Sequence, residues 1–122
     1  MSDSGVLAST KVAADISFDS VMVTDAQGAI VYVNDAFETL TGHSRAEVMG
    51  QSAKFLQGAA TDSAVIARLT DDLANGRVFE GRAINYKKDG TPFVMHWTVA
   101  PVQPADGTSV THYVAVQRVL SQ

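Results

Sequence analysis

The sequence contains no cysteine, and this absence removes several kinds of chemistry at once. A protein without cysteine cannot form disulfides, bind a metal through thiolates or use a thiol as a catalytic nucleophile. No Ser/His/Asp arrangement, paired carboxylates or phosphate-binding glycine loop is visible either. The three histidines, His43, His96 and His112, are not spaced as metal ligands are. The chain is therefore expected to be neither an enzyme nor a metal-binding protein.

Basic residues are also few. Nine lysines and arginines stand against thirteen aspartates and glutamates, which gives a net charge of -4. Nucleic acid favours a basic protein face, so it is not expected as the main partner. No apolar run approaches the roughly 20 residues of a membrane-spanning helix. Residues 1–10 also lack the basic start and the apolar run of a signal peptide. The sequence predicts a cytoplasmic protein with no membrane partner.

The apolar content is sufficient for one core. The chain has 122 residues, of which 46% are hydrophobic and 18% charged, as is typical of a single globular domain. Residues 19–120 are predicted to form this domain. Residues 1–18 are predicted to be an N-terminal extension, either a partly helical cap or a flexible segment, because their apolar spacing is weak.

The order of the apolar patterns predicts a helical middle between strands. Short β-type runs at 21–24 and 30–33 predict a hairpin. Three helical segments should follow, because capping side chains precede them. These side chains are Asn34 or Asp35, then Ser44 with Glu47 in a capping box, and then Thr61 or Asp62.

Three more strands are expected at 78–86, 93–102 and 110–120, with a tight hairpin turn at 87–90. Strands therefore flank the helices on both sides in the sequence. This order predicts an α+β fold, in which an antiparallel sheet carries short helices on one face.

Three blocks of the sequence resemble PAS domains, and among them the light-oxygen-voltage (LOV) branch. The blocks are 31–42, 50–58 and 85–93, and a closing segment at 113–117 extends the resemblance over about 21–119. The resemblance implies a PAS fold, with a five-stranded antiparallel sheet and short helices packed on one face. It also implies a flavin mononucleotide (FMN) held between the helices and the sheet.

The segment Gly-Gln-Ser-Ala-Lys-Phe-Leu-Gln at 50–57 is where the resemblance bears on photochemistry. In LOV domains this segment usually reads Gly-x-Asn-Cys-Arg-Phe-Leu-Gln, and its cysteine forms a reversible adduct with the photoexcited flavin. Ala53 occupies the cysteine position here, and a methyl group cannot act as a nucleophile. The resemblance therefore implies a flavin protein that absorbs blue light and fluoresces without forming this adduct.

Three amide side chains match LOV positions that contact the flavin. Asn85 corresponds to the first strand asparagine, Gln117 to the glutamine at the reactive edge of the ring, and Gln57 to the glutamine near the ribityl chain. An amide suits the polar edge of a flavin because it carries both a donor and an acceptor. The full set of expected cofactor-binding residues is Val23, Ser52, Ala53, Lys54, Leu56, Gln57, Asn85, Met95, Trp97, Ala115 and Gln117.

Other positions depart from the LOV pattern. Ser52 replaces a ribityl-binding asparagine, and Met95 replaces the second strand asparagine. Lys54 replaces a phosphate-binding arginine and keeps the charge without the bidentate fork. LOV domains have a second phosphate-binding arginine, and Thr70 occupies its position here. The nearby Arg68 is about 200° away from Thr70 on a helical wheel. These changes weaken the grip on phosphate more than on the ring, so riboflavin is the alternative cofactor.

Trp97 is expected on the wall of the pocket. If Asn85 lies opposite Met95 in the hairpin, then Ala83 faces Trp97, and all four side chains point to the same face. A small Ala83 beside a large Trp97 conserves volume. Trp97 could then contact the flavin and donate an electron to it. The alternative is that Trp97 is an ordinary core residue.

Two other functions stay open. The first is a PAS interaction module that binds no flavin or a different small ligand and forms a homodimer through the outer face of the sheet. The departures at Ser52, Lys54, Thr70 and Met95 motivate it. The second is a redox flavoenzyme, for which the sequence offers no residues of a substrate cleft.

Overall fold

The computed structural model of the protein describes residues 19–107 and 109–121. The expected N-terminal extension at 1–18 lies outside the described residues. The described chain begins with a strand hairpin, continues through short helices and ends in three longer strands. In order these elements are β1 (Ser20–Asp25), β2 (Ile30–Val33), α2 (Asp35–Thr41), α3 (Arg45–Val48), the 3-10 helix η1 (Ala53–Leu56), α4 (Ser63–Ala74), β3 (Phe79–Tyr86), β4 (Pro92–Val102) and β5 (His112–Ser121).

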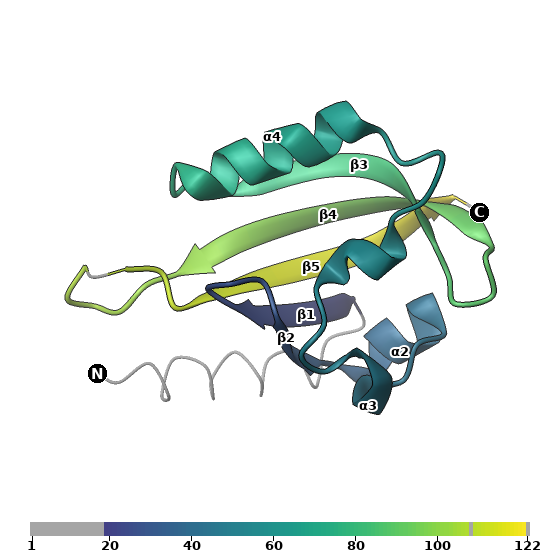
Figure 1. Cartoon of the computed structure of the whole chain (residues 1–122), viewed down its shortest axis with the longest axis horizontal. Coiled ribbons are helices and arrows are strands. Elements are labelled where there is room, and N and C mark those ends of the chain that lie inside the picture. Colours follow the sequence, from purple (N-terminus) through teal and green to yellow (C-terminus); the bar gives the residue numbers. More distant parts are fainter. Residues whose placement is uncertain (1–18, 108, 122) are drawn as a thin grey trace.

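The strands form one antiparallel sheet of five, in the order β2-β1-β5-β4-β3. The helices cover one face of the sheet (Figure 1): α4 lies along β3, and α2 and α3 pack near β1 and β2. The first and last strands of the chain are neighbours at the centre of the sheet. The predicted α+β fold with a five-stranded antiparallel sheet is confirmed.

The predicted helix caps are confirmed. Asn34 Oδ1 accepts from the backbone N–H of Phe37 at the start of α2. Ser44 and Glu47 form a reciprocal capping box on α3, and Asp62 caps α4. Each of these side chains satisfies backbone donors that the first turn of a helix leaves free. Local polar side chains therefore fix where the short helices begin.

An ion pair joins the helical layer to the hairpin between β3 and β4. Lys88 Nζ lies 2.8 Å from Glu47 Oε2. The Lys88 ammonium is the main cause that holds the pKa of the Glu47 carboxyl below its usual value. Both side chains are exposed to solvent, so the pair contributes little to the free energy of unfolding.

The register of β3 and β4 differs from the prediction by two residues. Asn85 lies opposite Phe93, Ala83 opposite Met95, and Gly81 opposite Trp97. The predicted pairing of Asn85 with Met95, and of Ala83 with Trp97, is therefore wrong. A shift by two keeps every side chain on its face, because side chains alternate with a period of two. The inner face thus still carries the expected residues.

The loop that joins these strands explains the difference in register. Lys87 N–H donates to Thr91 O at 2.9 Å, and Gly90 N–H donates to Lys87 O at 2.9 Å. Gly90 has φ +89°, a conformation that favours glycine. This geometry closes the hairpin directly after Lys87, which is tighter than the predicted pairing requires.

Candidate functional site

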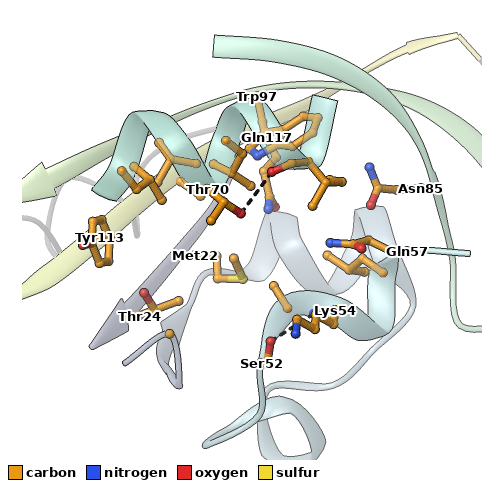
Figure 2. A pocket seen from close by; sticks show the side chains of 18 of the residues that line it. Met22, Thr24, Ser52, Lys54, Gln57, Thr70, Asn85, Trp97, Tyr113 and Gln117 are labelled. Atoms are coloured by element: carbon orange, nitrogen blue, oxygen red, sulfur yellow. Dashed lines mark hydrogen bonds between the residues drawn. The ribbon is translucent and has the colours of Figure 1, made fainter. Parts of the chain in front are cut away.

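A cavity of about 360 Å³ lies between the inner face of the sheet and the helical layer. Its volume falls within the range of small-molecule pockets, roughly 300–1,000 Å³. Figure 2 shows its polar side chains, which reach the cavity from β1, β3 and β5 on the sheet, from α4 and from the 52–57 segment. The lining residues are Met22, Thr24, Ala26, Gln27, Gly28, Ser52, Ala53, Lys54, Leu56, Gln57, Ile66, Leu69, Thr70, Leu73, Asn85, Met95, Trp97, Val99, Tyr113, Ala115 and Gln117.

Most of the residues expected to bind a cofactor lie around this cavity. They come from segments far apart in the sequence: η1 and its flanks, β3, β4 and β5. The folded chain therefore brings the predicted set together in one place. Its members on the cavity wall are Ser52, Ala53, Lys54, Leu56, Gln57, Asn85, Met95, Trp97, Ala115 and Gln117.

Val23 is the exception, and its expected place in the site is wrong. It is fully buried with Val21 and Tyr32 in a second cluster on the other face of the sheet. Its neighbours Met22 and Thr24 line the cavity instead. Successive side chains of a strand point to opposite faces, so β1 contributes its even-numbered residues to the cavity.

The segment 50–57 is anchored to β2 by backbone hydrogen bonds. Gly50 N–H donates to Ile30 O at 2.8 Å, and Ile30 N–H donates to Gln51 O at 2.9 Å. After this anchor, Ser52 caps η1 through the backbone N–H of Lys54. The anchor and the 3-10 turn hold residues 52–57 against the cavity, with Leu56 buried in the core.

Asn85 carries an unsatisfied polar group in this site. Its side chain is 3% exposed, and among the described residues its Nδ2 is the one buried side-chain nitrogen or oxygen without a hydrogen-bond partner. Buried polar groups are nearly always hydrogen-bonded, because burying one alone costs about 1–3 kcal/mol. Asn85 and Gln57 both line the cavity, and both are labelled in Figure 2. A ligand acceptor at this point would satisfy its N–H group.

Trp97 forms part of the cavity wall and of the core. Its side chain is 5% exposed, and its ring lies 5.0 Å from the Phe79 ring at an interplanar angle of 52°. Buried neighbours Met95 and Val99 on the same strand also line the cavity. This part of the wall is thus apolar and includes an aromatic ring, as is usual for small-molecule pockets.

Positive charge is scarce at the cavity. Lys54 is the one lysine or arginine along its described lining, and it is exposed. Arg68 lies elsewhere: its guanidinium donates to Glu80 O at 2.7 Å and stacks 4.9 Å over the Phe79 ring. Thr70 lines the cavity, but its hydroxyl donates to Ile66 O at 3.1 Å. The site can therefore offer an anion one flexible cation.

Several lining residues were not expected from the sequence. Those on α4 follow the apolar stripe of that helix, so its helical spacing was the signal that could have found them. Those on β1, β4 and β5 follow from strand alternation once the inner face is known. No sequence pattern indicated that residues of the turn after β1 line the cavity. These residues are Met22, Thr24, Ala26, Gln27, Gly28, Ile66, Leu69, Leu73, Val99 and Tyr113.

Two further features of the described chain bear on function. Across residues 19–107 and 109–121, no group of three or more His, Cys, Asp or Glu side chains is placed to hold a metal ion. Over the same residues, no helix has the length and apolar character to cross a membrane. His96 lies on the strand face opposite Trp97, where it is paired with Glu80.

Comparison with known proteins identifies the family. A family model described as "PAS domain" matches residues 19–120. The solved LOV domain from Erythrobacter litoralis EL346 blue-light activated histidine kinase is 33% identical with a TM-score of 0.80, and the match covers 85% of this chain and 97% of that one. The chain therefore belongs to the PAS domain family. Within that family it is homologous to LOV domains.

Two other matches show how such domains occur in longer proteins. Phototropin-2 of Oryza sativa subsp. japonica is 41% identical over 93 residues, which cover 76% of this chain and 10% of that protein. The solved "RNA-binding Light-Oxygen-Voltage Receptor" is 29% identical with a TM-score of 0.84, over 99% of this chain and 35% of that one. The chain thus spans about a tenth of the phototropin and a third of the receptor.

The expectations about partners and activity stay predictions. RNA binding belongs to that receptor, of which this chain matches about a third. The net charge of -4 disfavours nucleic acid here. A homodimer, the absence of enzymatic activity and a cytoplasmic location are likewise untested.

Proposed function

We propose that this domain binds a flavin without a covalent bond and acts as a blue-light sensor module that fluoresces and forms no cysteinyl adduct. The observation that carries the proposal is the buried, unpaired Asn85 Nδ2 in a mostly apolar cavity that also receives Gln57 and Gln117. A flavin has a flat apolar body and one polar edge, so it needs apolar walls and a few amides. Homology to LOV domains supports the same ligand.

Different side chains would contact different parts of such a ligand. Trp97, Met95 and Leu56 would enclose the ring and exclude water. Asn85 and Gln117 would supply donors and acceptors to its polar edge. Gln57 and Ser52 lie on the helical side of the cavity, where they would contact the ribityl chain. The bound flavin itself would supply absorption of blue light.

The absence of a thiol limits the photochemistry of the site. The chain has no cysteine, and Ala53 lines the cavity on η1. No side chain here can repeat the nucleophilic attack that LOV cysteines perform. The excited state is then left to fluorescence, oxygen sensitisation or electron transfer.

The spectrum of the purified protein tests the proposal. We expect a yellow preparation that absorbs blue light, emits green fluorescence and releases FMN or riboflavin on denaturation. A protein that is colourless as purified, and stays so after FMN or riboflavin is added, would refute it. That result would favour the alternative of a PAS interaction module without flavin, which a measurement of oligomeric state would then examine.

For the cofactor we propose FMN, with riboflavin as a close competitor. Lys54 is the one cation at the cavity among the described residues, and it is exposed, so its attraction for a phosphate is weak and screened by salt. Lys54→Gln should reduce the affinity for FMN about two- to fivefold and leave riboflavin unchanged. Competition titrations at low and high salt measure both.

The control for Lys54→Gln is Lys87→Gln, which removes the same charge outside the cavity lining. It should alter neither affinity. If Lys54→Gln weakens riboflavin and FMN equally, Lys54 acts on the ring or the fold rather than on the phosphate.

Trp97 is proposed as an electron donor to the excited ligand. It lies on the cavity wall, and indole is a readily oxidised side chain. Trp97→Phe keeps an aromatic wall while removing the donor, so fluorescence should rise about twofold or more, and photoreduction in oxygen-free buffer should slow. Tyr113→Phe is the comparison, since Tyr113 also lines the cavity. Unchanged fluorescence in Trp97→Phe would leave Trp97 as a core residue only.

A further inference from the structure

A buried hydrogen bond fixes the amide of Gln117 at the wall of the cavity. Ser20 Oγ donates to Gln117 Oε1 over 2.9 Å, and the two residues are 3% and 2% exposed. They are also backbone neighbours, because β1 pairs with β5 so that Ser20 lies opposite Gln117. The bond therefore joins β1 and β5, the first and last strands of the chain, beside the cavity.

This bond decides which end of the amide is left for a ligand. A carboxamide has one acceptor oxygen and two N–H donors. Ser20 occupies the oxygen, while the Nε2 of Gln117 has no hydrogen-bond partner among the described residues. Gln117 lines the cavity, where an unpartnered N–H group can meet a ligand. The geometry thus leaves the N–H donors of Gln117 for an acceptor in the cavity.

We propose that Ser20 is a positioning residue, which holds Gln117 so that its amide donates toward an acceptor on the edge of the ligand. The inference rests on the proposed flavin site and extends it to a residue that does not line the cavity. A serine hydroxyl can also accept a hydrogen bond. Ser20 therefore keeps a bond to Gln117 if the amide turns over when the ligand edge gains a proton.

Contacts around Ser20 link this hydrogen bond to residues at the surface. Asp19 pairs with Arg118 at 2.9 Å, directly beside the Ser20–Gln117 pair. Asn34, the N-cap of α2, donates from Nδ2 to Asp19 O and accepts at Oδ1 from Val21 N–H. Ser20 and Gln117 also line a surface groove next to α2. A change in the orientation of the Gln117 side chain would therefore act directly on Ser20 at the start of β1.

Two substitutions whose new side chains have the same shape isolate the effect of the Ser20 hydroxyl. Ser20→Thr keeps it and Ser20→Val replaces it by a methyl group, while both add the same bulk. Thr98→Val is the matched control, because Thr98 lies on the same sheet outside the cavity lining. Ser20→Ala replaces Ser20→Val if valine prevents folding.

The first measurement needs no flavin. In N–H correlation NMR spectra of the ligand-free protein, we expect the Gln117 side-chain pair, assigned by its loss in Gln117→Leu, to shift in Ser20→Val. It should stay near its wild-type position in Ser20→Thr and Thr98→Val. Gln117 signals that coincide in Ser20→Thr and Ser20→Val would overturn the inference, whether or not the protein binds flavin.

The second measurement uses FMN and riboflavin. Ser20→Val should move the emission maximum of the bound flavin by several nanometres and raise Kd about two- to tenfold, as the loss of one oriented hydrogen bond would. Ser20→Thr should restore both. A wild-type spectrum and Kd in Ser20→Val would also contradict the inference. If neither flavin binds the wild-type protein, the proposed function fails, and the NMR result alone decides the role of Ser20.

Discussion

Asn85→Leu is expected to change stability and ligand affinity in opposite directions. In the ligand-free protein, leucine removes a buried N–H group that has no partner and fills a similar volume. The free energy of unfolding should rise by about 1–2 kcal/mol, and the melting temperature by several degrees. Thermal or denaturant unfolding of the ligand-free protein measures this gain.

The same substitution should weaken flavin binding. Leucine cannot donate to the polar edge of the ring, and it leaves a ligand acceptor buried without a partner. The affinity for FMN or riboflavin should fall about ten- to a hundredfold. Ile84→Val is the control, since Ile84 neighbours Asn85 on β3 without lining the cavity. It should lower stability slightly and leave the affinity unchanged.

An Asn85→Leu protein that loses stability and keeps its flavin affinity would contradict this account. It would show that Asn85 is satisfied within the protein and does not meet the ligand. A protein in which both properties stay constant would place the flavin elsewhere in the domain.

Ala53→Cys is expected to make the bound flavin photochemically reversible. The substitution restores a thiol, the nucleophile that LOV domains use, at a position on the cavity wall. Blue light should then bleach the visible absorption almost completely, and the absorption should recover in the dark. The wild-type protein should show neither effect, because alanine has no nucleophilic atom.

Ala53→Ser is the control for this experiment. It adds one polar atom of similar size but no thiol, so its spectrum should be stable under the same light. If the Ala53→Cys spectrum is equally stable, the flavin ring does not lie over η1. The departures at Ser52, Lys54 and Met95 would then have moved the ligand from its place in related domains.

The sequence predicted the architecture because its signals are local and agree with one another. Asn34, Ser44 and Asp62 carry capping side chains, and a cap acts within one helical turn. β3 and β4 alternate between buried and more exposed residues along most of their length, so strand periodicity identifies their inner face.

Val23 was misplaced because β1 gives no such alternation. Every residue from Ser20 to Thr24 is buried, so both faces of the strand are covered and the pattern cannot tell them apart. The register of β3 and β4 was missed for a different reason. It depends on how tightly Gly90 closes the loop, whereas the buried pattern is unchanged by a shift of two residues.

The polar residues of the site could be predicted from the sequence only in part. Asn85 and Gln117 could be named from their positions in strands and from family resemblance. Their partners depend on contacts between segments far apart in the chain. The bond from Ser20 to Gln117 spans 97 positions, and the unpaired Nδ2 of Asn85 is visible only once its neighbours are placed.

The central claim is that a flavin binds in the cavity beside Trp97, and the tryptophan itself can report on it. Trp97 is the one tryptophan of the chain, and it lines the cavity. Titrating ligand-free protein with FMN should quench its emission saturably at about one flavin per chain, and Asn85→Leu should shift the curve to higher concentration. Emission that does not saturate, or a curve that Asn85→Leu leaves in place, would contradict binding at this site.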